Sequence, residues 1–206
     1  MSYCRGTSFR LRTDHGMTIV HWIIGAFWLV FLAYWAIAAV GVKRNIKATP
    51  WWKYAALRLA IAALIIAAVS MPAVRRALRL APVHLGHDPL LGAIGALLVA
   101  LGVGLAIFAR IYIGRNWGTP MSRKQDPELV TGGPYALIRH PIYSGIILAT
   151  VGTMIGLSFV WVLPLVVLIP YFIYCARREE EFMCQQFGEA YRAYMRRTRM
   201  LVPFLL

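Results

Sequence analysis

Residues 142–176 read IYSGIILATVGTMIGLSFVWVLPLVVLIPYFIYCA and contain no charged residue. At about 1.5 Å per helical residue, this stretch is too long for one crossing of a membrane and just long enough for two. We therefore predict a tight hairpin of two transmembrane helices, with its turn near Ser158 to Pro164.

Three further apolar segments precede this hairpin. They run from Thr18 to Val42, from Trp51 to Pro72 and from about Pro89 to Ile113. Each is long enough to cross the hydrocarbon core as a helix, which takes roughly 20 residues. The predicted fold is all-α: a multi-span transmembrane helical bundle of about five spans, ending in the hairpin and a cytoplasmic amphipathic cap.

The composition also favours a membrane protein. Hydrophobic residues make up 60% of the 206 residues, and the mean hydropathy of +0.63 leaves too little polar material to cover a soluble domain. The net charge is +14, and the basic residues lie between and after the apolar segments. This distribution favours contact with anionic lipid headgroups over nucleic-acid binding. The three cysteines show neither paired nor CxxC spacing, so neither a disulfide framework nor a zinc site is indicated.

The basic residues also predict an orientation. Lys and Arg concentrate in the connecting segments 43–53, 110–139 and 177–199. The positive-inside rule then places the N-terminus outside, and the C-terminus and both flanks of the hairpin in the cytoplasm. We divide the chain into residues 1–113, with the first three transmembrane helices, and residues 114–206, with a cofactor-binding loop, the hairpin and a cytoplasmic helix.

A polar cluster stands at the entrance to the hairpin. His140 precedes Pro141, so His140 should be extended while Pro141 opens the first hairpin helix. The free amides and the dipole at that helix start favour an anionic group, such as a cofactor carboxylate. Gly132-Gly133-Pro134 allows a close turn, and Tyr135 and Tyr143 can offer aromatic faces to a base or a cation. Each residue alone is better explained as part of an ordinary loop or as an interfacial anchor; the clustering of the residues indicates a binding site.

Glu179 and Glu180 follow the second hairpin helix directly. Charged groups held against both ends of a membrane hairpin are costly, which favours a function for them. Either carboxylate could bind ribose hydroxyls or an ammonium group, or both could form a solvated charge run. Beyond them, Phe187, Tyr191 and Tyr194 recur at helical spacing, and we expect the helix to continue along the headgroup surface as an amphipathic cap.

The order and spacing of these motifs resemble the isoprenylcysteine carboxyl methyltransferase family and its prokaryotic relatives. The matching residues are Gly133, Tyr135, Arg139-His140-Pro141, Tyr143, Gly145, Glu179-Glu180, Phe187-Gly188, Tyr191, Tyr194, Arg199 and Pro203. The resemblance implies a membrane methyltransferase that uses S-adenosyl-L-methionine. It implies cofactor contacts at Pro127, Glu128, Leu129, Val130, Tyr135, His140, Pro141, Ile142, Tyr143, and Glu179 or Glu180.

The chain departs from the family at one position. The family carries an arginine, linked to the acceptor carboxylate, about four residues before its cofactor-binding glutamate. Cys175 stands there, with Arg177 and Arg178 slightly later, and we take Arg177 or Arg178 as the candidate catalytic substitute. The acceptor therefore stays open between a prenylcysteine carboxylate, a phospholipid amine, a small thiol and another lipid.

These features predict an enzyme in the lipid bilayer that methylates a lipophilic or membrane-partitioned acceptor, with no nucleic-acid partner. We expect no metal, because no further ligands accompany His84, His87 and Asp88. Two alternatives remain. Membrane sterol reductases, which would bind NADPH, end in a similar motif, although the intact run from Arg139 to Tyr143 argues against them. A non-enzymatic membrane scaffold is the other alternative, and the oligomeric state is not predicted.

Overall fold

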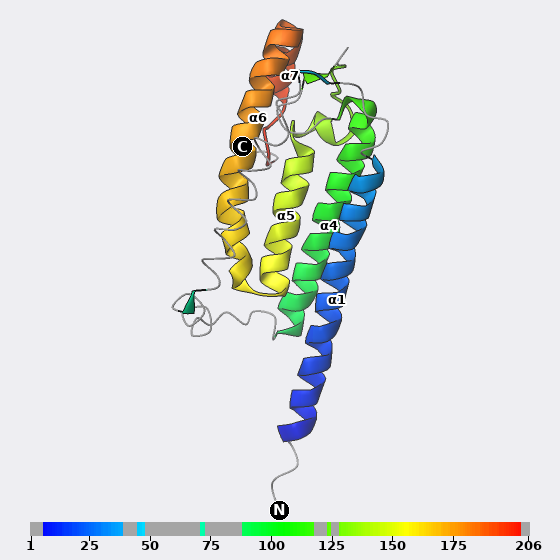
Figure 1. The fold of residues 1–206 in the computed structure, drawn as a ribbon, viewed down its shortest axis with the longest axis vertical. Helices are drawn as coiled ribbons and strands as arrows, with labels where there is room; N and C mark the ends of the chain where they lie inside the picture. Colours follow the sequence, from blue (N-terminus) through cyan, green and yellow to red (C-terminus); the bar gives the residue numbers. More distant parts are fainter. Residues whose placement is uncertain are drawn as a thin grey trace, which may run out of the picture.

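The computed structural model describes residues 6–38, 45–47, 71–72, 88–117, 123–124 and 128–202. Its long elements are helices, so the all-α prediction is confirmed (Figure 1). They are α1 (Gly6–Ala38), α4 (Pro89–Ile113), α5 (Pro141–Gly156), α6 (Val162–Phe187) and α7 (Glu189–Arg197), with short 3-10 helices at Gly114–Asn116, Gly133–Ala136 and Phe159–Trp161. A two-stranded antiparallel ladder, which was not predicted, pairs β1 (Asn45–Lys47) with β2 (Arg123–Lys124).

Within the part of the chain that the structure describes, three helical segments are long and apolar enough to cross a membrane: Ile19–Ala38, Pro89–Asn116 and Phe159–Phe187. The chain is therefore an integral membrane protein. The helix α4 has the predicted bounds, and α5 and α6 form the predicted hairpin. The helix α1 begins at Gly6, well before the predicted Thr18. The predicted span from Trp51 to Pro72 lies outside the described residues except for its last two, so the number of spans stays a prediction.

Small residues bring the backbones of α4 and α5 together. Gly145, Ala149, Gly152 and Gly156 are all buried on one stripe of α5. A Cβ added to Gly152 would lie only 2.7 Å from the carbonyl oxygen of Gly95 on α4. This stripe therefore packs α5 against α4, and any larger side chain would separate the two helices.

The helix α1 completes this rigid support. Ile24 of α1 forms a buried cluster with Val99 and Val103 of α4. The indole Nε1 of Trp28 donates a hydrogen bond of 3.0 Å to the Thr153 hydroxyl on α5. Hydrogen bonds between membrane helices typically contribute about 0.6 to 2 kcal/mol, so this one helps to hold α5, and the residues at its start, in place.

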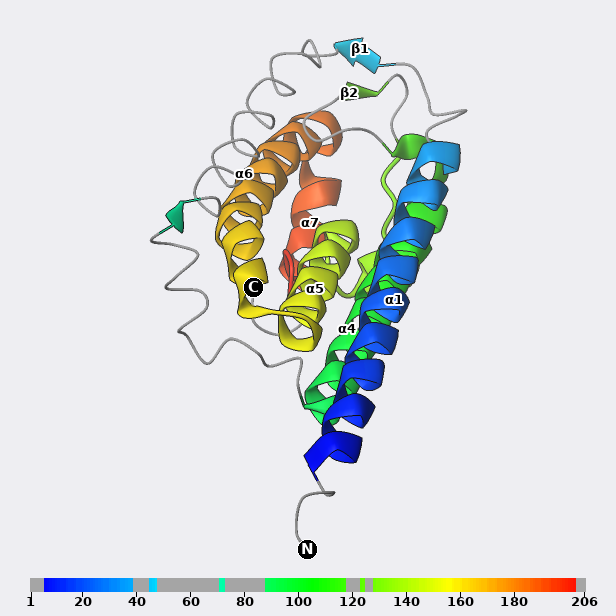
Figure 2. The same ribbon diagram turned by 60° about the horizontal axis from the view of Figure 1, so that its bottom comes forward.

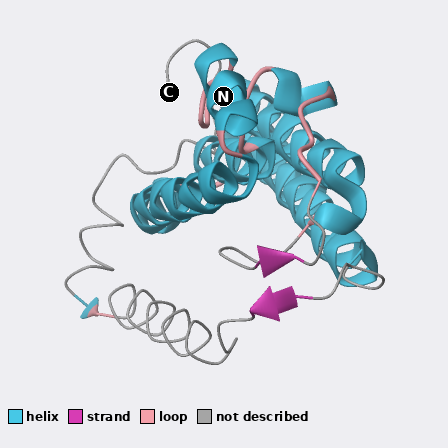
Figure 3. Cartoon of the chain, turned by 90° about the horizontal axis from the view of Figure 1, so that it is seen from above, coloured by secondary structure: helices cyan, strands magenta, loops and turns pink. Residues whose placement is uncertain are grey.

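The polar segments gather at one end of the bundle, called the polar end below. The helices α1, α4 and α6 finish there and α5 begins there (Figures 1 and 2). The ladder of β1 and β2 links the chain after α1 to the chain after α4, and its two strands lie side by side when viewed from above (Figure 3). The loop before the hairpin and the segment after it therefore share one end, as the orientation argument requires.

The structure corrects the predicted course of the chain after α6. The helix does not continue without a break, because it ends at Phe187 and Gly188 has a φ of +54°. Glycine adopts this left-handed region without the strain of a Cβ, so the chain can reverse there. The following helix, α7, folds back onto α6 (Figure 1), bringing the Met195 sulfur within 3.7 Å of the Cys184 sulfur. Its apolar face, with Tyr191 and Tyr194, is buried in the protein.

Candidate functional site

The two ends of the hairpin meet at the polar end of the bundle. Arg139, in the loop before α5, donates from Nε to Oε1 of Glu180 on α6 at 2.6 Å. The same Glu180 oxygen lies 3.3 Å from Nε2 of His140. The side chains of all three residues are at most 9% exposed. A carboxylate in so closed a place is stabilised by its charged partners, and here both partners come from the run that precedes α5.

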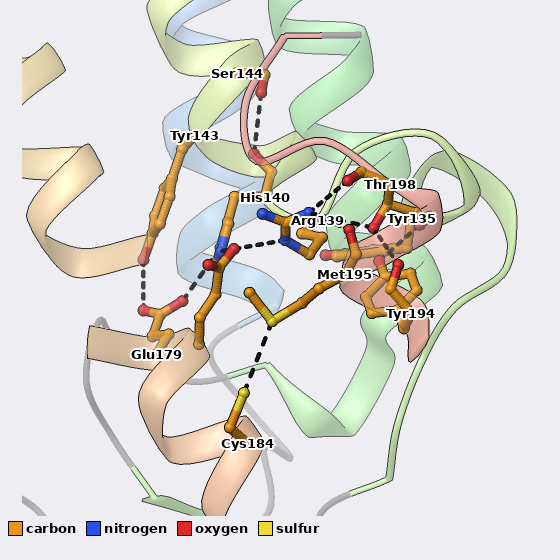
Figure 4. A network of polar contacts seen from close by, with 11 residues as sticks. Tyr135, Arg139, His140, Tyr143, Ser144, Glu179, Cys184, Tyr194, Met195 and Thr198 are labelled. Atoms are coloured by element: carbon orange, nitrogen blue, oxygen red, sulfur yellow. Dashed lines mark hydrogen bonds and ion pairs between the residues drawn. The ribbon is translucent and has the colours of Figure 1, made fainter. Parts of the chain in front are cut away.

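Glu179 forms a second link between the two ends of the hairpin. The hydroxyl of Tyr143 on α5 donates to Oε1 of Glu179 at 2.6 Å, and Nδ1 of His140 lies 3.5 Å from Oε2 of Glu179 (Figure 4). The Glu179 side chain is 29% exposed, against 8% for Glu180. Of the two carboxylates, Glu179 is therefore the more accessible to a ligand.

Aromatic rings continue from these polar groups into the bundle. The His140 ring is parallel to the Tyr143 ring at 5.5 Å, and the Tyr143 ring stacks on Phe172 at 4.6 Å. Phe172 is buried one helical turn before Ala176 on the inner face of α6. The stack fixes the planes of His140 and Tyr143, and so directs their polar atoms toward the two glutamates.

The sequence around Pro141 explains how His140 is held. Its φ of −124° and ψ of 59° lie outside the helical region, as expected for a residue before proline, and α5 begins at Pro141. The amide of His140 donates to the carbonyl of Met200 at 3.0 Å, and its own carbonyl accepts from the Ser144 hydroxyl at 3.1 Å. The Ser144 hydroxyl also contacts the carbonyl of Leu201. Met200 and Leu201 thus hold the backbone around His140.

The charges around His140 alter its proton affinity. Burial by itself lowers the pKa of the imidazole, but hydrogen bonds to Glu179 and Glu180, and their negative charges, outweigh burial. The pKa of His140 is therefore raised above its usual value. A protonated His140 neutralises part of the charge of the two carboxylates.

The structure places Tyr135 among packed groups at the polar end. It is 6% exposed, its hydroxyl donates to the carbonyl of Ala109 at 3.4 Å, and its own carbonyl accepts from the Tyr194 hydroxyl at 2.6 Å. The pKa of Tyr135 is raised above its usual value, mainly because the side chain is buried. Nearby Gly133 has a φ of +57° and lies against the Tyr112 ring, where a Cβ would not fit. Tyr135 therefore joins α4 to α7 through hydrogen bonds.

The predicted loop contacts are only partly described. Pro127 lies outside the described residues. Glu128 is exposed and forms two hydrogen bonds of 3.4 Å with the Asn116 side chain, which places it beside the end of α4. Leu129 and Val130 are half-buried. The role of residues 128–130 as cofactor contacts stays a prediction.

Arg177 and Arg178, the candidate catalytic arginines, are exposed on α6. Arg178 pairs with Glu181 at 2.6 Å, with both side chains about half exposed. Cys175 is fully buried, on the face of α6 that carries Phe172. The structure brings His140, Tyr143, Glu179 and Glu180 together but leaves Arg177 and Arg178 exposed on α6. Pro141 and Ile142 lie in the first turn of α5.

Two arginines, Arg139 and Arg110, have structural roles that the sequence did not predict. Arg139 reaches beyond Glu180 and donates to carbonyl groups at the end of α7. Arg110 on α4 is 5% exposed, donates to the carbonyl of Gly114 at 2.7 Å and to the carbonyl of Ala38, and lies 4.6 Å from the centre of the Trp117 ring. It thereby caps the ends of α1 and α4. Its position at the end of an apolar helix was a visible signal, but the sequence does not reveal its two carbonyl partners.

The described residues contain no group of three or more His, Cys, Asp or Glu side chains that could hold a metal ion. His84 and His87, considered above as metal ligands, lie outside the described residues. The expectation that the protein binds no metal therefore stays a prediction.

Comparisons with known proteins agree with the motifs. Residues 90–190 match the family model described as phospholipid methyltransferase. Protein-S-isoprenylcysteine O-methyltransferase B of Arabidopsis thaliana is 33% identical over 115 residues, which cover 54% of this chain and 58% of that protein. The cobalt-zinc-cadmium resistance protein CzcN of Cupriavidus metallidurans is 32% identical over 130 residues, which cover 57% of this chain and 51% of that protein.

A solved structure of the eukaryotic intramembrane Ras methyltransferase ICMT aligns with a TM-score of 0.49 and 25% identity, covering 78% of this chain and 55% of that chain. The matched part is less than two thirds of the length of each of these relatives. The sequence matches confirm that the chain is related to the isoprenylcysteine carboxyl methyltransferase family.

Proposed function

We propose that this relative of the isoprenylcysteine carboxyl methyltransferases is an integral membrane enzyme that transfers a methyl group from S-adenosyl-L-methionine to a lipophilic acceptor. The observation that carries the proposal is the junction of the two hairpin ends, where His140 and Tyr143 meet Glu179 and Glu180. We also propose that this end of the bundle faces the cytoplasm, where the donor is available, and that residues 114–206 form the donor-binding part.

The chemistry of these residues fits the donor. Glu179, 29% exposed, can accept hydrogen bonds from an ammonium group or from ribose hydroxyls. The start of α5 favours an anionic group such as the donor carboxylate, through the amides of Ile142 and Tyr143 and the helix dipole, while Pro141 sets the helix start. Glu180 is nearly closed to solvent and contacts Arg139 and His140, so its part is to position the other groups.

The bound donor would supply a methyl group that is activated by its positive sulfonium. The residues of this chain would bind and orient the reactants, since well-oriented reactants can gain roughly 7–11 kcal/mol of the barrier. The stacked rings of Tyr143 and Phe172 form an aromatic surface next to the carboxylates. Such a surface keeps water from the reacting groups, where opposite charges cancel during methyl transfer to an anion.

The acceptor is proposed only as a lipophilic molecule that reaches the site from the bilayer. A prenylcysteine carboxylate fits the names of the relatives, and a phospholipid fits the name of the matching family model. Cys175 offers no positive charge to a carboxylate, and Arg177 and Arg178 are exposed. If either arginine binds the acceptor, it would have to do so at the outer surface of α6.

Binding experiments on the purified full-length protein in lipid nanodiscs test this proposal. Calorimetric titration should show binding of S-adenosyl-L-methionine and S-adenosyl-L-homocysteine, and no binding of NADPH. Glu179→Gln should weaken both interactions, whereas Arg196→Gln, which removes an exposed ion pair with Glu189, should not. Binding of NADPH alone would favour a reductase, and a folded protein that binds none of the three would favour a scaffold; either result contradicts the proposal.

A further inference from the structure

Arg139 joins three parts of the chain at the polar end. Its Nε donates to Glu180 on α6, and its Nη1 donates to the carbonyl of Thr198 at 2.6 Å and to the carbonyl of Met195 at 3.3 Å. The two carbonyls belong to the last turn of α7 and the residue that ends it. With its side chain 9% exposed, Arg139 makes these contacts in a place with little water. Arginine suits such a position because its planar group carries several donors in a fixed fork.

The backbone beside Arg139 is paired with the C-terminal segment. The amide of Arg139 donates to the carbonyl of Arg199 at 2.8 Å, and the amide of Arg199 donates to the carbonyl of Leu137 at 3.2 Å. These bonds form a parallel bridge between Ile138 and Arg199. The next amide, that of His140, bonds to Met200. Residues 198–201, called the C-terminal segment here, therefore run alongside the loop that delivers His140 to the site.

We propose that Arg139 is a positioning residue for the donor site, which holds the Glu180 carboxylate and the C-terminal segment in fixed places relative to His140 and Tyr143. The inference rests on the proposed function and extends it, because it makes the end of the chain part of the donor-binding structure. Arg139 need not touch the donor. It acts on His140 in two ways: through Glu180, which lies 3.3 Å from the His140 ring, and through the backbone hydrogen bond between His140 and Met200.

The consequence for substitutions follows from burial. Without the guanidinium, the Glu180 carboxylate keeps only His140 as a charged partner among the contacts described above, and the last carbonyls of α7 lose a donor. Buried groups that lose charged partners rearrange or bind others, so His140 should be drawn toward Glu180 and away from Glu179. Donor binding should then weaken even where the bundle stays folded, because the α4–α5 packing lies outside these contacts.

The test uses the full-length protein in nanodiscs, with S-adenosyl-L-homocysteine as the probe. Arg139→Gln should lower the affinity by roughly tenfold, because Glu180 and the backbone that carries His140 would no longer be held in place. Arg139→Lys should lose less, because it keeps a positive charge beside Glu180 but not the fork. Arg196→Gln is the matched control, because Arg196 pairs with Glu189 at 2.7 Å while 65% exposed. Thermal unfolding without the probe identifies folded variants.

A second readout does not depend on the donor. The titratable and charged groups that face His140 are Glu179 and Glu180 from α6 and Tyr143 from α5, with Arg139 beside it in the loop. Removing Arg139 leaves more negative charge for His140 to neutralise. The NMR titration of the His140 ring, identified by its loss in His140→Gln, should therefore move to higher pH in Arg139→Gln and stay in place in Arg196→Gln.

The outcomes separate the two proposals. A folded Arg139→Gln protein that binds the probe like wild type, or an unmoved His140 titration, would overturn the positioning role alone. If Arg139→Gln does not fold, a folded Arg139→Lys protein with wild-type affinity would overturn it as well. A wild-type protein that does not bind the probe would overturn the proposed function, while the His140 titration would still decide whether Arg139 holds Glu180.

Discussion

The Tyr143 hydroxyl donates a hydrogen bond of 2.6 Å to the Glu179 carboxylate, and thereby links the start of α5 to the C-terminal half of α6. The two residues lie 36 positions apart, on opposite sides of an uncharged hairpin. Bonds between a hydroxyl and a charged carboxylate are among the stronger ones in proteins, so the orientation of Glu179 depends on Tyr143.

Replacing Tyr143 by Phe tests this dependence. The substitution removes the hydroxyl and keeps a ring that can stack between His140 and Phe172. We expect the affinity for S-adenosyl-L-methionine to fall by roughly tenfold, the factor that corresponds to about 1.5 kcal/mol for one hydrogen bond to a charged group. Calorimetric titration measures it, and wild-type affinity in a folded Tyr143→Phe protein would show that the hydroxyl does not orient Glu179 for binding.

The contact between α4 and α5 predicts different costs for two glycines of one helix. A Cβ on Gly102 would collide with the backbone of Ala149 and with the carbonyl oxygen of Gly145, whereas a Cβ on Gly104 would meet nothing within 4 Å. Gly102→Ala should destabilise the protein by about 1–3 kcal/mol, the usual cost of overpacking. Gly104→Ala should be neutral or stabilising, because alanine favours the helix. Thermal unfolding in one detergent compares them, and equal effects would show that the close approach is not required.

His140 predicts a pH dependence of stability. Its pKa is raised in the folded protein by Glu179 and Glu180, which outweigh burial. The stabilisation from the imidazolium is therefore fully present below the unfolded pKa of about 6.5 and is lost as the pH rises through the higher folded pKa. The difference in unfolding temperature between wild type and His140→Gln should be largest at mildly acidic pH and shrink in alkaline solution. A difference that grows with pH would mean that His140 is neutral in the folded state.

The reversal at Gly188 predicts that this residue resists substitution for backbone reasons alone. Its φ of +54° is unfavourable for a residue with a Cβ, although a Cβ there would have no neighbour within 4 Å. Gly188→Ala should therefore cost about 1–2 kcal/mol. Gly188→Asn should cost about as much, because asparagine tolerates the left-handed helical region, where ψ is positive, whereas the ψ of Gly188 is −125°. If alanine and asparagine at position 188 leave the unfolding temperature equal to that of wild type, α7 does not depend on this conformation.

Patterns along the chain predicted the parts of the fold that depend on local sequence. The uncharged run 142–176 predicted the hairpin, and the proline at position 141 predicted where α5 begins, because both depend on helix length and backbone geometry. The fold back of α7 was missed. Helical spacing alone predicted that the helix would continue through residues 187–194, and the positive φ at Gly188 that breaks the helix is not visible in a periodic pattern.

The candidate site was predicted as a set of residues but not as a network. The motif run named His140, Tyr143, Glu179 and Glu180, which the structure joins by hydrogen bonds and ion pairs. The different roles of the two glutamates depend on exposure and on the reach of Arg139, which are properties of the packed structure. The ladder of β1 and β2 depends on pairing between residues far apart in the chain, so no local sequence pattern could predict it.

The central claim is that the two ends of the hairpin hold one methyl donor between them. Ultraviolet cross-linking of radiolabelled S-adenosyl-L-methionine to the full-length protein in nanodiscs, followed by mass spectrometry of the labelled peptides, tests it most directly. We predict that the label lies on peptides with residues 140–143 or 179–180, and that excess S-adenosyl-L-homocysteine prevents labelling. Label confined to the N-terminal helices, or labelling that the competitor does not prevent, would contradict the account.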